Sequence, residues 1–202
     1  MNTITYTQKK RQKSNQGFTL VESLVSILIL LLVVVGPMTI AAKGLQNSYF
    51  ASEQITAVFL AQEAMESIQK LRLDSALEVS TNGGTGSTWD WFNSDIDASC
   101  KTADGCDVNM IDPANVSFVD CPAGGCRLKT RPDSSSANIE YGDVPSWTDD
   151  SIYTRSIVVT DEGGDQASVT VTVKWNTNLF SGPREVVLQG WIFNQYDLLE
   201  NP

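Results

Sequence analysis

The sequence predicts an α+β fold, in which a long N-terminal helix packs by its second half on a C-terminal antiparallel β-sheet. Three patterns predict this architecture: an apolar run near the N-terminus, an apolar stripe with helical spacing after it, and two-residue alternation near the C-terminus. The chain has 202 residues, which is enough for one head domain besides the long helix.

Residues 1–17 form a basic leader. Four cations and no carboxylate precede Gly17, namely Lys9, Lys10, Arg11 and Lys13. Because cationic flanks resist translocation, they hold this end of the chain on the cytoplasmic side of a membrane. The leader is polar, so we expect it to be disordered, to lie outside the fold and to be absent from the mature protein.

Residues 18–43 are predicted to be the transmembrane half of the helix. No charged residue occurs from Ser23 to Ala42, and about 20 helical residues rise about 30 Å, the thickness of a bilayer's hydrocarbon core. A secretory signal would be cut after this run, where only Ala41-Ala42-Lys43 is a weak candidate. The segment is therefore interpreted as a single-pass anchor, with the bulk of the chain exported.

The pair Gly36-Pro37 lies inside this run. Proline in a helix removes one backbone hydrogen bond and clashes with the preceding turn, so we expect a kink or local unwinding between Val33 and Pro37. The simplest interpretation is a kink without a function, because helices in lipid tolerate proline.

A single carboxylate, Glu22, lies near the start of the apolar segment. A carboxylate at membrane depth costs up to about 2.5–3.5 kcal/mol, so it calls for a partner. It ends the motif Gly17-Phe18-Thr19-Leu20-Val21-Glu22. This motif resembles the type III signal, or prepilin N-terminal methylation motif, of type IV pilins and pseudopilins. The basic leader and the apolar run extend the resemblance.

The resemblance implies the type IV pilin fold and a processing step. A prepilin peptidase would cut between Gly17 and Phe18 and methylate the new amine of Phe18; glycine has no Cβ, which lets a protease approach closely. Glu22 would dock against the terminal amine of a neighbouring subunit, because an opposite charge satisfies a buried acid. The region of Gly36 and Pro37 would be a flexing point of the helix in a filament.

The same resemblance implies partners and a location. The partners are the prepilin peptidase, other pilin and minor pilin subunits, an inner-membrane assembly platform and membrane lipid. The precursor would be a single-pass inner-membrane protein with a cytoplasmic leader and an exported head. The processed chain would then enter a pilus or pseudopilus filament.

Residues 44–73 are predicted to be the amphipathic half of the same helix. Apolar residues recur there at helical spacing and form one stripe, whereas the residues between them are polar. The stripe comprises Ala57, Leu60, Ala61, Ala64, Ile68 and Leu71. It needs a cover, which the C-terminal part of the chain must supply.

Residues 74–202 are predicted to form the head. As far as residue 153 the pattern is irregular, with a loop at Gly83-Gly84-Thr85-Gly86-Ser87 and an aromatic cluster at Trp89-Asp90-Trp91-Phe92. So long an irregular segment is unusual in a compact domain, so we expect short helices or strands within it.

The end of the chain predicts three strands. Apolar and polar residues alternate in Tyr153–Val159 and in Ser168–Trp175, and Glu162–Asp165 supplies residues that suit a hairpin turn. A third strand is predicted from about Arg184 to Phe193. The result is an antiparallel meander whose apolar face covers the stripe on the helix.

The four cysteines fall into two close pairs: Cys100, Cys106, Cys121 and Cys126. On the exported side of a membrane they are expected to form disulfides. Bonds between sequence neighbours are favoured because they close small loops, and the crossed connectivities remain open. Zinc is the weaker interpretation, because the spacings are loose and the chain has no histidine.

The composition of the chain argues against several classes of function. The formal net charge is −10, which argues against a nucleic-acid-binding groove. The absence of histidine removes the commonest general base and metal ligand, so we expect neither an enzyme nor a bound cofactor or metal. The acids Asp161, Glu162 and Asp165 are interpreted as solvated turn residues, with calcium as the weaker alternative.

The function that the resemblance implies is that of a minor pilin, a low-copy structural subunit that takes part in pilus assembly or modification. Phe18–Leu32 and the valine-rich strands look most like the V-type minor pilins, or type IV pilus modification proteins. An I-type pseudopilin of a type II secretion system is the near alternative. A membrane-anchored surface-binding protein that keeps its leader is the alternative from another class.

Overall fold

The structure is a computed structural model that describes residues 17, 19–81, 87, 89–109, 116–131, 140–142, 144, 146–147, 149–163, 166–177 and 182–194. The chain divides into two compact units, Met1–Ser48 and Tyr49–Pro202. The predictions for the basic leader, for Phe18 and for the glycine-rich loop at residues 83–86 lie outside the described residues.

The helix α1 (Leu20–Thr81) begins in the N-terminal unit. All of its side chains in this unit are exposed to solvent. Val25 is the least exposed of the large apolar side chains between residues 20 and 45, and it is still 51% exposed. This part of α1 therefore has no hydrophobic core of its own.

The helix passes through Gly36 and Pro37 without a break. The local unwinding expected between Val33 and Pro37 is absent, because all of these residues are helical. The missing N–H of proline removes only one bond of the helical ladder, and the Thr39 hydroxyl donates to the Gly36 carbonyl at 2.7 Å. A kink or flexing point at this pair stays a prediction.

From Tyr49 onward α1 belongs to the head unit and buries one face. The predicted stripe is confirmed, with Leu71 only partly buried. The prediction that the helix ends near Leu73 was wrong, because the buried stripe continues for two more turns and the helix ends at Thr81. The buried residues of this part are Ala57, Leu60, Ala61, Ala64, Met65, Ser67, Ile68, Ser75, Ala76 and Val79.

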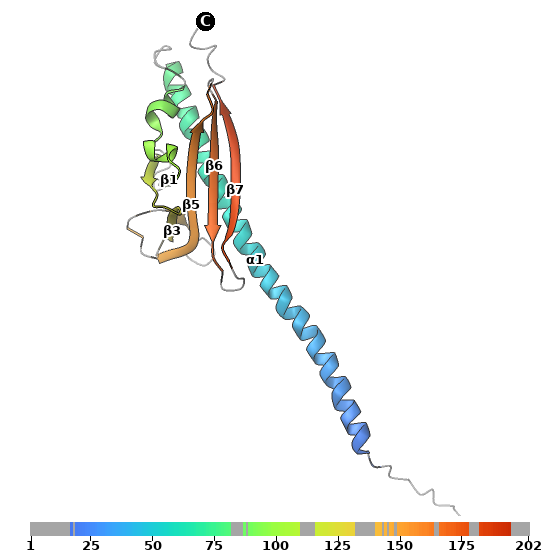
Figure 1. The fold of residues 1–202 in the computed structure, drawn as a ribbon. Helices are drawn as coiled ribbons and strands as arrows, with labels where there is room; N and C mark the ends of the chain where they lie inside the picture. The colour runs from blue at the N-terminus through green and yellow to red at the C-terminus, as the bar shows by residue number, and fades with distance from the viewer. Residues whose placement is uncertain are drawn as a thin grey trace, which may run out of the picture. The chain divides into compact units, whose positions relative to one another are not determined.

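The described strands form one seven-stranded antiparallel sheet. They are β1 (Cys106–Asn109), β2 (Ser117–Asp120), β3 (Cys126–Thr130), β4 (Tyr141–Gly142), β5 (Asp149–Asp161), β6 (Gln166–Trp175) and β7 (Arg184–Phe193). The predicted C-terminal meander is confirmed as β5–β6–β7, side by side in Figure 1, and β7 has the predicted bounds. The alternating valines of β6 face the core because side chains in a strand point to opposite faces in turn, whereas Val187 and Trp191 of β7 are exposed.

The expectation of a three-stranded sheet was incomplete, because β5 is long enough to pair on both of its edges. One edge pairs with β6 along Tyr153–Asp161. Along the other, β3 pairs with β5 between Asp149 and Arg155, and β1 pairs with it at Ile157. The four short strands from the irregular segment thus extend the sheet beyond β5, and β2 and β4 lie outside β1 and β3.

The irregular segment also contains two short helices, the π-helical turn η1 (Trp91–Asp95) and the 3₁₀ helix η2 (Ala98–Lys101). The rings of Trp89, Trp91 and Phe92 contact one another, with centroids 5.3–5.7 Å apart. Trp91 is fully buried in the core of the head. The predicted aromatic cluster is therefore part of the core.

The core of the head lies between α1 and the inner face of the sheet. Ala61, Ala64 and Ile68 of α1 belong to one buried cluster with Val171 and Val173 of β6. This cluster confirms the predicted α+β class, with the sheet covering the stripe on the helix. Figure 1 shows this part of α1 behind the meander.

Candidate functional site

The N-terminal motif lies at the start of α1. Gly17 and Thr19 are outside the helix, which begins at Leu20. The Ser23 N–H donates to the Thr19 carbonyl at 3.1 Å, which is the first bond of the helical ladder. The bond predicted to be cut, after Gly17, therefore lies ahead of the first helical turn. Phe18, the residue predicted to be methylated, is outside the described residues.

Thr19 caps this helix. Its Oγ1 accepts the N–H of Glu22 at 3.3 Å, and the Thr-x-x-Glu spacing is that of a capping box. Glu22 also lies in the first turn, where the helix dipole favours an acid. The structure thus gives Glu22 a local environment that was not predicted, although the Thr-x-x-Glu spacing before an apolar run is a sequence signal for it.

The helix that follows this cap suits a membrane. Among the described residues, α1 is the helix that is long and apolar enough to span a bilayer, judged by length and composition. The most apolar part of α1 is wholly exposed in the isolated chain. A surface of this kind has to be covered by lipid or by other protein chains.

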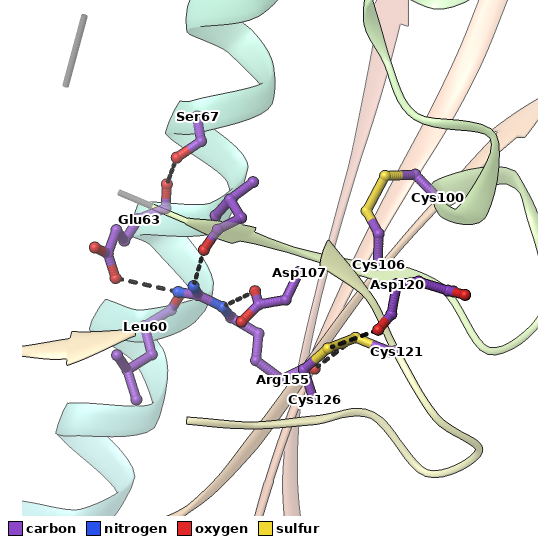
Figure 2. Close-up of polar contacts among 11 residues, drawn as sticks. Leu60, Glu63, Ser67, Cys100, Cys106, Asp107, Asp120, Cys121, Cys126 and Arg155 are labelled. Atoms are coloured by element: carbon purple, nitrogen blue, oxygen red, sulfur yellow. Dashed lines mark hydrogen bonds and ion pairs between the residues drawn. A yellow bond between two sulfur atoms is a disulfide. The ribbon is translucent and has the colours of Figure 1, made fainter. Parts of the chain in front are cut away.

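A second polar site lies in the head, around Arg155 of β5 (Figure 2). The Arg155 Nε donates to Asp107 Oδ1 at 2.6 Å, and its Nη2 donates to the Val108 carbonyl at 3.3 Å. Its Nη1 donates to the Leu60 carbonyl and to Glu63 Oε2, both at 3.1 Å. One buried guanidinium therefore joins β5 to β1 and to α1.

The charges in this cluster compensate one another. The side chains of Arg155 and Asp107 are 1% and 0% exposed, whereas that of Glu63 is 35% exposed. Burial by itself lowers the pKa of Arg155, but the carboxylates of Asp107 and Glu63 outweigh it and raise that pKa above its ordinary value. The two carboxylates therefore favour the charged form of the guanidinium.

Tyr153 supplies another polar link between β5 and α1. Its hydroxyl donates to the Glu53 carbonyl at 3.1 Å. Burial raises the pKa of Tyr153 to about 12, and the nearby Tyr141 and Glu53 add to this effect. Both links hold the second half of α1 on the sheet. Because they compensate buried polar groups within the head, we assign them a structural role.

The cysteines form the two disulfides favoured from the sequence, Cys100–Cys106 and Cys121–Cys126. The first joins η2 to the start of β1, and the second closes the turn between β2 and β3. Since all four sulfur atoms are bonded in pairs, the weaker zinc interpretation was wrong. The disulfides lie in the head unit, whereas Gly17 and Glu22 lie in the N-terminal unit.

The acidic turn after β5 has internal hydrogen bonds. Asp161 Oδ1 accepts the N–H of Gly163 at 2.8 Å, and Glu162 Oε1 accepts the hydroxyl of Ser168 at 2.6 Å. Gly163 has a φ of 78°, a conformation that favours glycine in such a turn. These contacts support the hairpin interpretation. Asp165 lies outside the described residues.

Comparison with known proteins gives a match at the N-terminal site. Residues 12–36 match the family of the prokaryotic N-terminal methylation motif. This stretch contains Gly17, Phe18 and Glu22, so it supports a type IV pilin-like or pseudopilin-like protein with a type III signal. The motif implies processing by a prepilin peptidase and assembly with other pilins. No curated protein and no solved structure matches the chain.

The cluster around Arg155 was not predicted from the sequence. The signal available was an arginine at an inward-facing position of an alternating strand, between Tyr153 and Ile157. A buried charge requires a partner, yet the sequence does not name it. Asp107 lies 48 residues away and Glu63 lies 92 residues away along the chain.

Proposed function

We propose that this chain is a minor pilin, a low-copy structural subunit of a type IV pilus that takes part in pilus assembly or modification. It is made as a membrane-bound precursor, is cut after Gly17, and enters the filament by the first part of α1. The subunit has no catalytic activity and no cofactor in this proposal. The V-type minor pilins are the subtype that its sequence resembles most.

The observation that carries the proposal is the match of residues 12–36 to the methylation motif, on a helix whose side chains remain exposed as far as Ser48. A processing motif alone is compatible with a solitary anchor. The exposed apolar helix beyond it supplies a surface on which other helices can pack once the chain leaves the lipid. The head folds as a separate unit, so the first part of α1 can lie in lipid or among other helices while the head lies in water.

An I-type pseudopilin of a type II secretion system is the second candidate, because the same motif occurs in both classes. The cysteine-bearing loops and the size of the head favour the pilus. An unprocessed surface-binding protein is the candidate from another class, and it predicts that residues 1–17 stay attached. Recovery of the chain in pilus filaments sheared from its own cells supports the first candidate over both others.

The role of Glu22 is tested by separating charge from helix capping. Glu22→Gln keeps a side chain that a capping box accepts and removes the negative charge. Thr19→Val keeps the charge and removes the Oγ1 that caps the helix. Each variant is produced in the native host, and its amount in sheared filaments is divided by its amount in the membrane.

If the Glu22 charge docks the subunit, Glu22→Gln should lower the filament-to-membrane ratio at least about tenfold, which corresponds to about 1.4 kcal/mol. Thr19→Val should leave the ratio within about threefold of wild type. Membrane insertion should be normal in both variants, because neither adds a charge to the apolar run. Normal incorporation of Glu22→Gln, or an equal loss in both variants, would remove the docking role of the carboxylate.

A further inference from the structure

We propose that the Cys100–Cys106 disulfide is a latch that holds α1 on the sheet of the head, and that it acts through the buried Arg155. The latch closes when the two cysteines are oxidised after export. It lies within the head unit, and it does not depend on the proposed function of the N-terminal motif.

Arg155 is the point at which three elements are joined. It lies on β5, and two of its nitrogens bond to Asp107 and Val108 of β1. The third bonds to α1, at the Leu60 carbonyl and at Glu63 (Figure 2). The contacts with β1 and those with α1 therefore share one side chain.

The position of β1 depends on few backbone contacts with the rest of the sheet. It pairs with β5 at one position, Cys106 opposite Ile157, and its other neighbour is the short strand β2. By contrast, β6 pairs with β5 continuously along Tyr153–Asp161. The disulfide to Cys100 supplies a covalent tie directly beside Asp107. The tie matters because the ladder pair between β1 and β5 is at Cys106, the residue next to Asp107.

The other end of this tie is anchored in the core. Cys100 belongs to η2 and is fully buried. The next residue, Lys101, donates from its ammonium group to the Phe92 carbonyl, and Phe92 packs in the aromatic cluster. The disulfide thus connects β1 to η2 and the aromatic cluster, which make no bond to Arg155 among the contacts described above.

Loss of the disulfide is transmitted to α1 by electrostatics. If β1 moves, Arg155 loses the Asp107 carboxylate and the Val108 carbonyl. A buried guanidinium without its counter-ion requires water. Among the bonded partners of Arg155, Glu63 of α1 borders solvent, with its side chain 35% exposed, so water is expected to enter on the side of α1. Opening of the disulfide is therefore expected to loosen α1 next to Arg155 while the β5–β6–β7 meander stays intact.

The redox chemistry of the latch is a thiol–disulfide exchange. The two thiols of Cys100 and Cys106 lose two protons and two electrons, and one S–S bond forms. The electrons pass to the disulfide of an oxidising partner in the compartment that receives the exported head, and this disulfide is reduced to two thiols. A dithiol such as dithiothreitol carries out the reverse step and becomes a cyclic disulfide.

The second disulfide provides a matched control. Cys126 is the ladder partner of Arg155, and the Cys121 Sγ lies 3.8 Å from the Arg155 carbonyl oxygen. These contacts are with the backbone of Arg155. The Cys121 N–H also donates to the Gly105 carbonyl at 3.3 Å, just ahead of β1. Alanine at positions 121 and 126 keeps all of these backbone groups, so removal of this disulfide should leave the charge cluster in place.

Hydrogen exchange of the full chain in detergent micelles, followed by mass spectrometry, tests the latch. Three proteins are compared: wild type, Cys100→Ala/Cys106→Ala and Cys121→Ala/Cys126→Ala. We expect the first variant to exchange the amides of residues 57–68 at least about tenfold faster than wild type. The second should change them less than about threefold, and the amides of β6 and β7 should stay slow in all three.

A further pair of substitutions tests the route through Arg155. In an Arg155→Met/Asp107→Leu background, loss of Cys100–Cys106 should no longer accelerate exchange at residues 57–68. The proposal is overturned if that acceleration persists, if both disulfide variants loosen α1 equally, or if neither does.

The reverse measurement applies if the Cys100→Ala/Cys106→Ala variant does not fold. Coupling is reciprocal, so weakening the contact with α1 should expose the disulfide. Glu63→Gln should make Cys100–Cys106 about fivefold more sensitive to dithiothreitol and leave Cys121–Cys126 unchanged. Equal sensitivity of Cys100–Cys106 in Glu63→Gln and wild type overturns the proposal.

Discussion

The two parts of α1 have the same secondary structure but differ in the exposure of their apolar side chains. In the part of α1 that belongs to the N-terminal unit, the large apolar side chains are all exposed, and even Val25 is 51% exposed. In the head unit one face is covered, and Ala57, Ala61, Ala64 and Ile68 are completely buried. The first part buries no side chain, whereas the second buries one stripe and leaves other apolar side chains, such as Phe59, exposed. The head part therefore has its partner within the chain, and the partner of the first part lies outside it.

The largest effect is expected in the head, from breaking the charge cluster. Asp107→Ala removes the buried counter-ion of the Arg155 guanidinium. Removal of one partner of a buried ion pair lowers the free energy of unfolding by about 3–5 kcal/mol. Denaturant unfolding of the full chain in detergent measures the loss. The exposed neighbour Asp104 is the control, since Asp104→Ala should change the free energy of unfolding by less than about 0.5 kcal/mol. Equal effects of the two would show that Asp107 has no special role.

The same substitution in each part of α1 sharpens the comparison. Ile68 is fully buried and Ile29 is 55% exposed. Ile68→Ala should lower the free energy of unfolding of the head by about 2–5 kcal/mol, because it removes buried apolar area and leaves a cavity. Ile29→Ala should leave the head's unfolding midpoint unchanged. A loss of head stability in Ile29→Ala would contradict the division of the helix into two environments.

A smaller effect is expected at the start of the helix. Thr19→Val removes the hydroxyl that accepts the Glu22 N–H, and loss of an N-cap costs about 1 kcal/mol. Amide exchange at residues 20–23 should become faster. Thr39→Val is the control, since the Thr39 hydroxyl donates to a carbonyl inside the helix and caps nothing. Unchanged exchange at residues 20–23 in Thr19→Val would show that Thr19 does not cap α1.

The smallest effect is a loss of stability at alkaline pH. Burial raises the folded-state pKa of Tyr153 to about 12, above its ordinary value of 10.0. The neutral phenol therefore contributes stability that is complete below about pH 10 and is lost as the pH rises toward 12. Tyr153→Phe should flatten this part of the stability profile, measured by denaturant unfolding at each pH. An unchanged slope would place the alkaline loss at another group, such as Tyr141.

Regular patterns in the sequence predicted the parts of the fold that depend on local periodicity. The alternation in β6 and the spacing from Ala57 to Ile68 each fill one face of an element, so the period reveals which face is buried. The same reasoning ended α1 too early, because Ser75 and Ala76 continue the buried stripe with small residues that carry little hydrophobic signal. The close cysteine pairs were predictable because short loops close easily.

The remaining features depend on contacts between distant residues. The strands β1 to β4 have two to five residues each, too few to show a period. The strands β1 and β3 form because the second edge of β5 offers them hydrogen-bond partners, and β2 and β4 then pair with β1 and β3. Likewise, the inward position of Arg155 was visible in the alternation, but its pairing with Asp107 follows from the packing of β1 against β5 and α1.

The intact mass of the protein purified from its own cells tests the central claim most directly. The account predicts a chain that begins at Phe18 and carries one methyl group on its N-terminal amine. A chain that still begins at Met1, or one cut after the apolar run near Ala42, would contradict it, because the first part of α1 would then be a permanent anchor or a discarded signal.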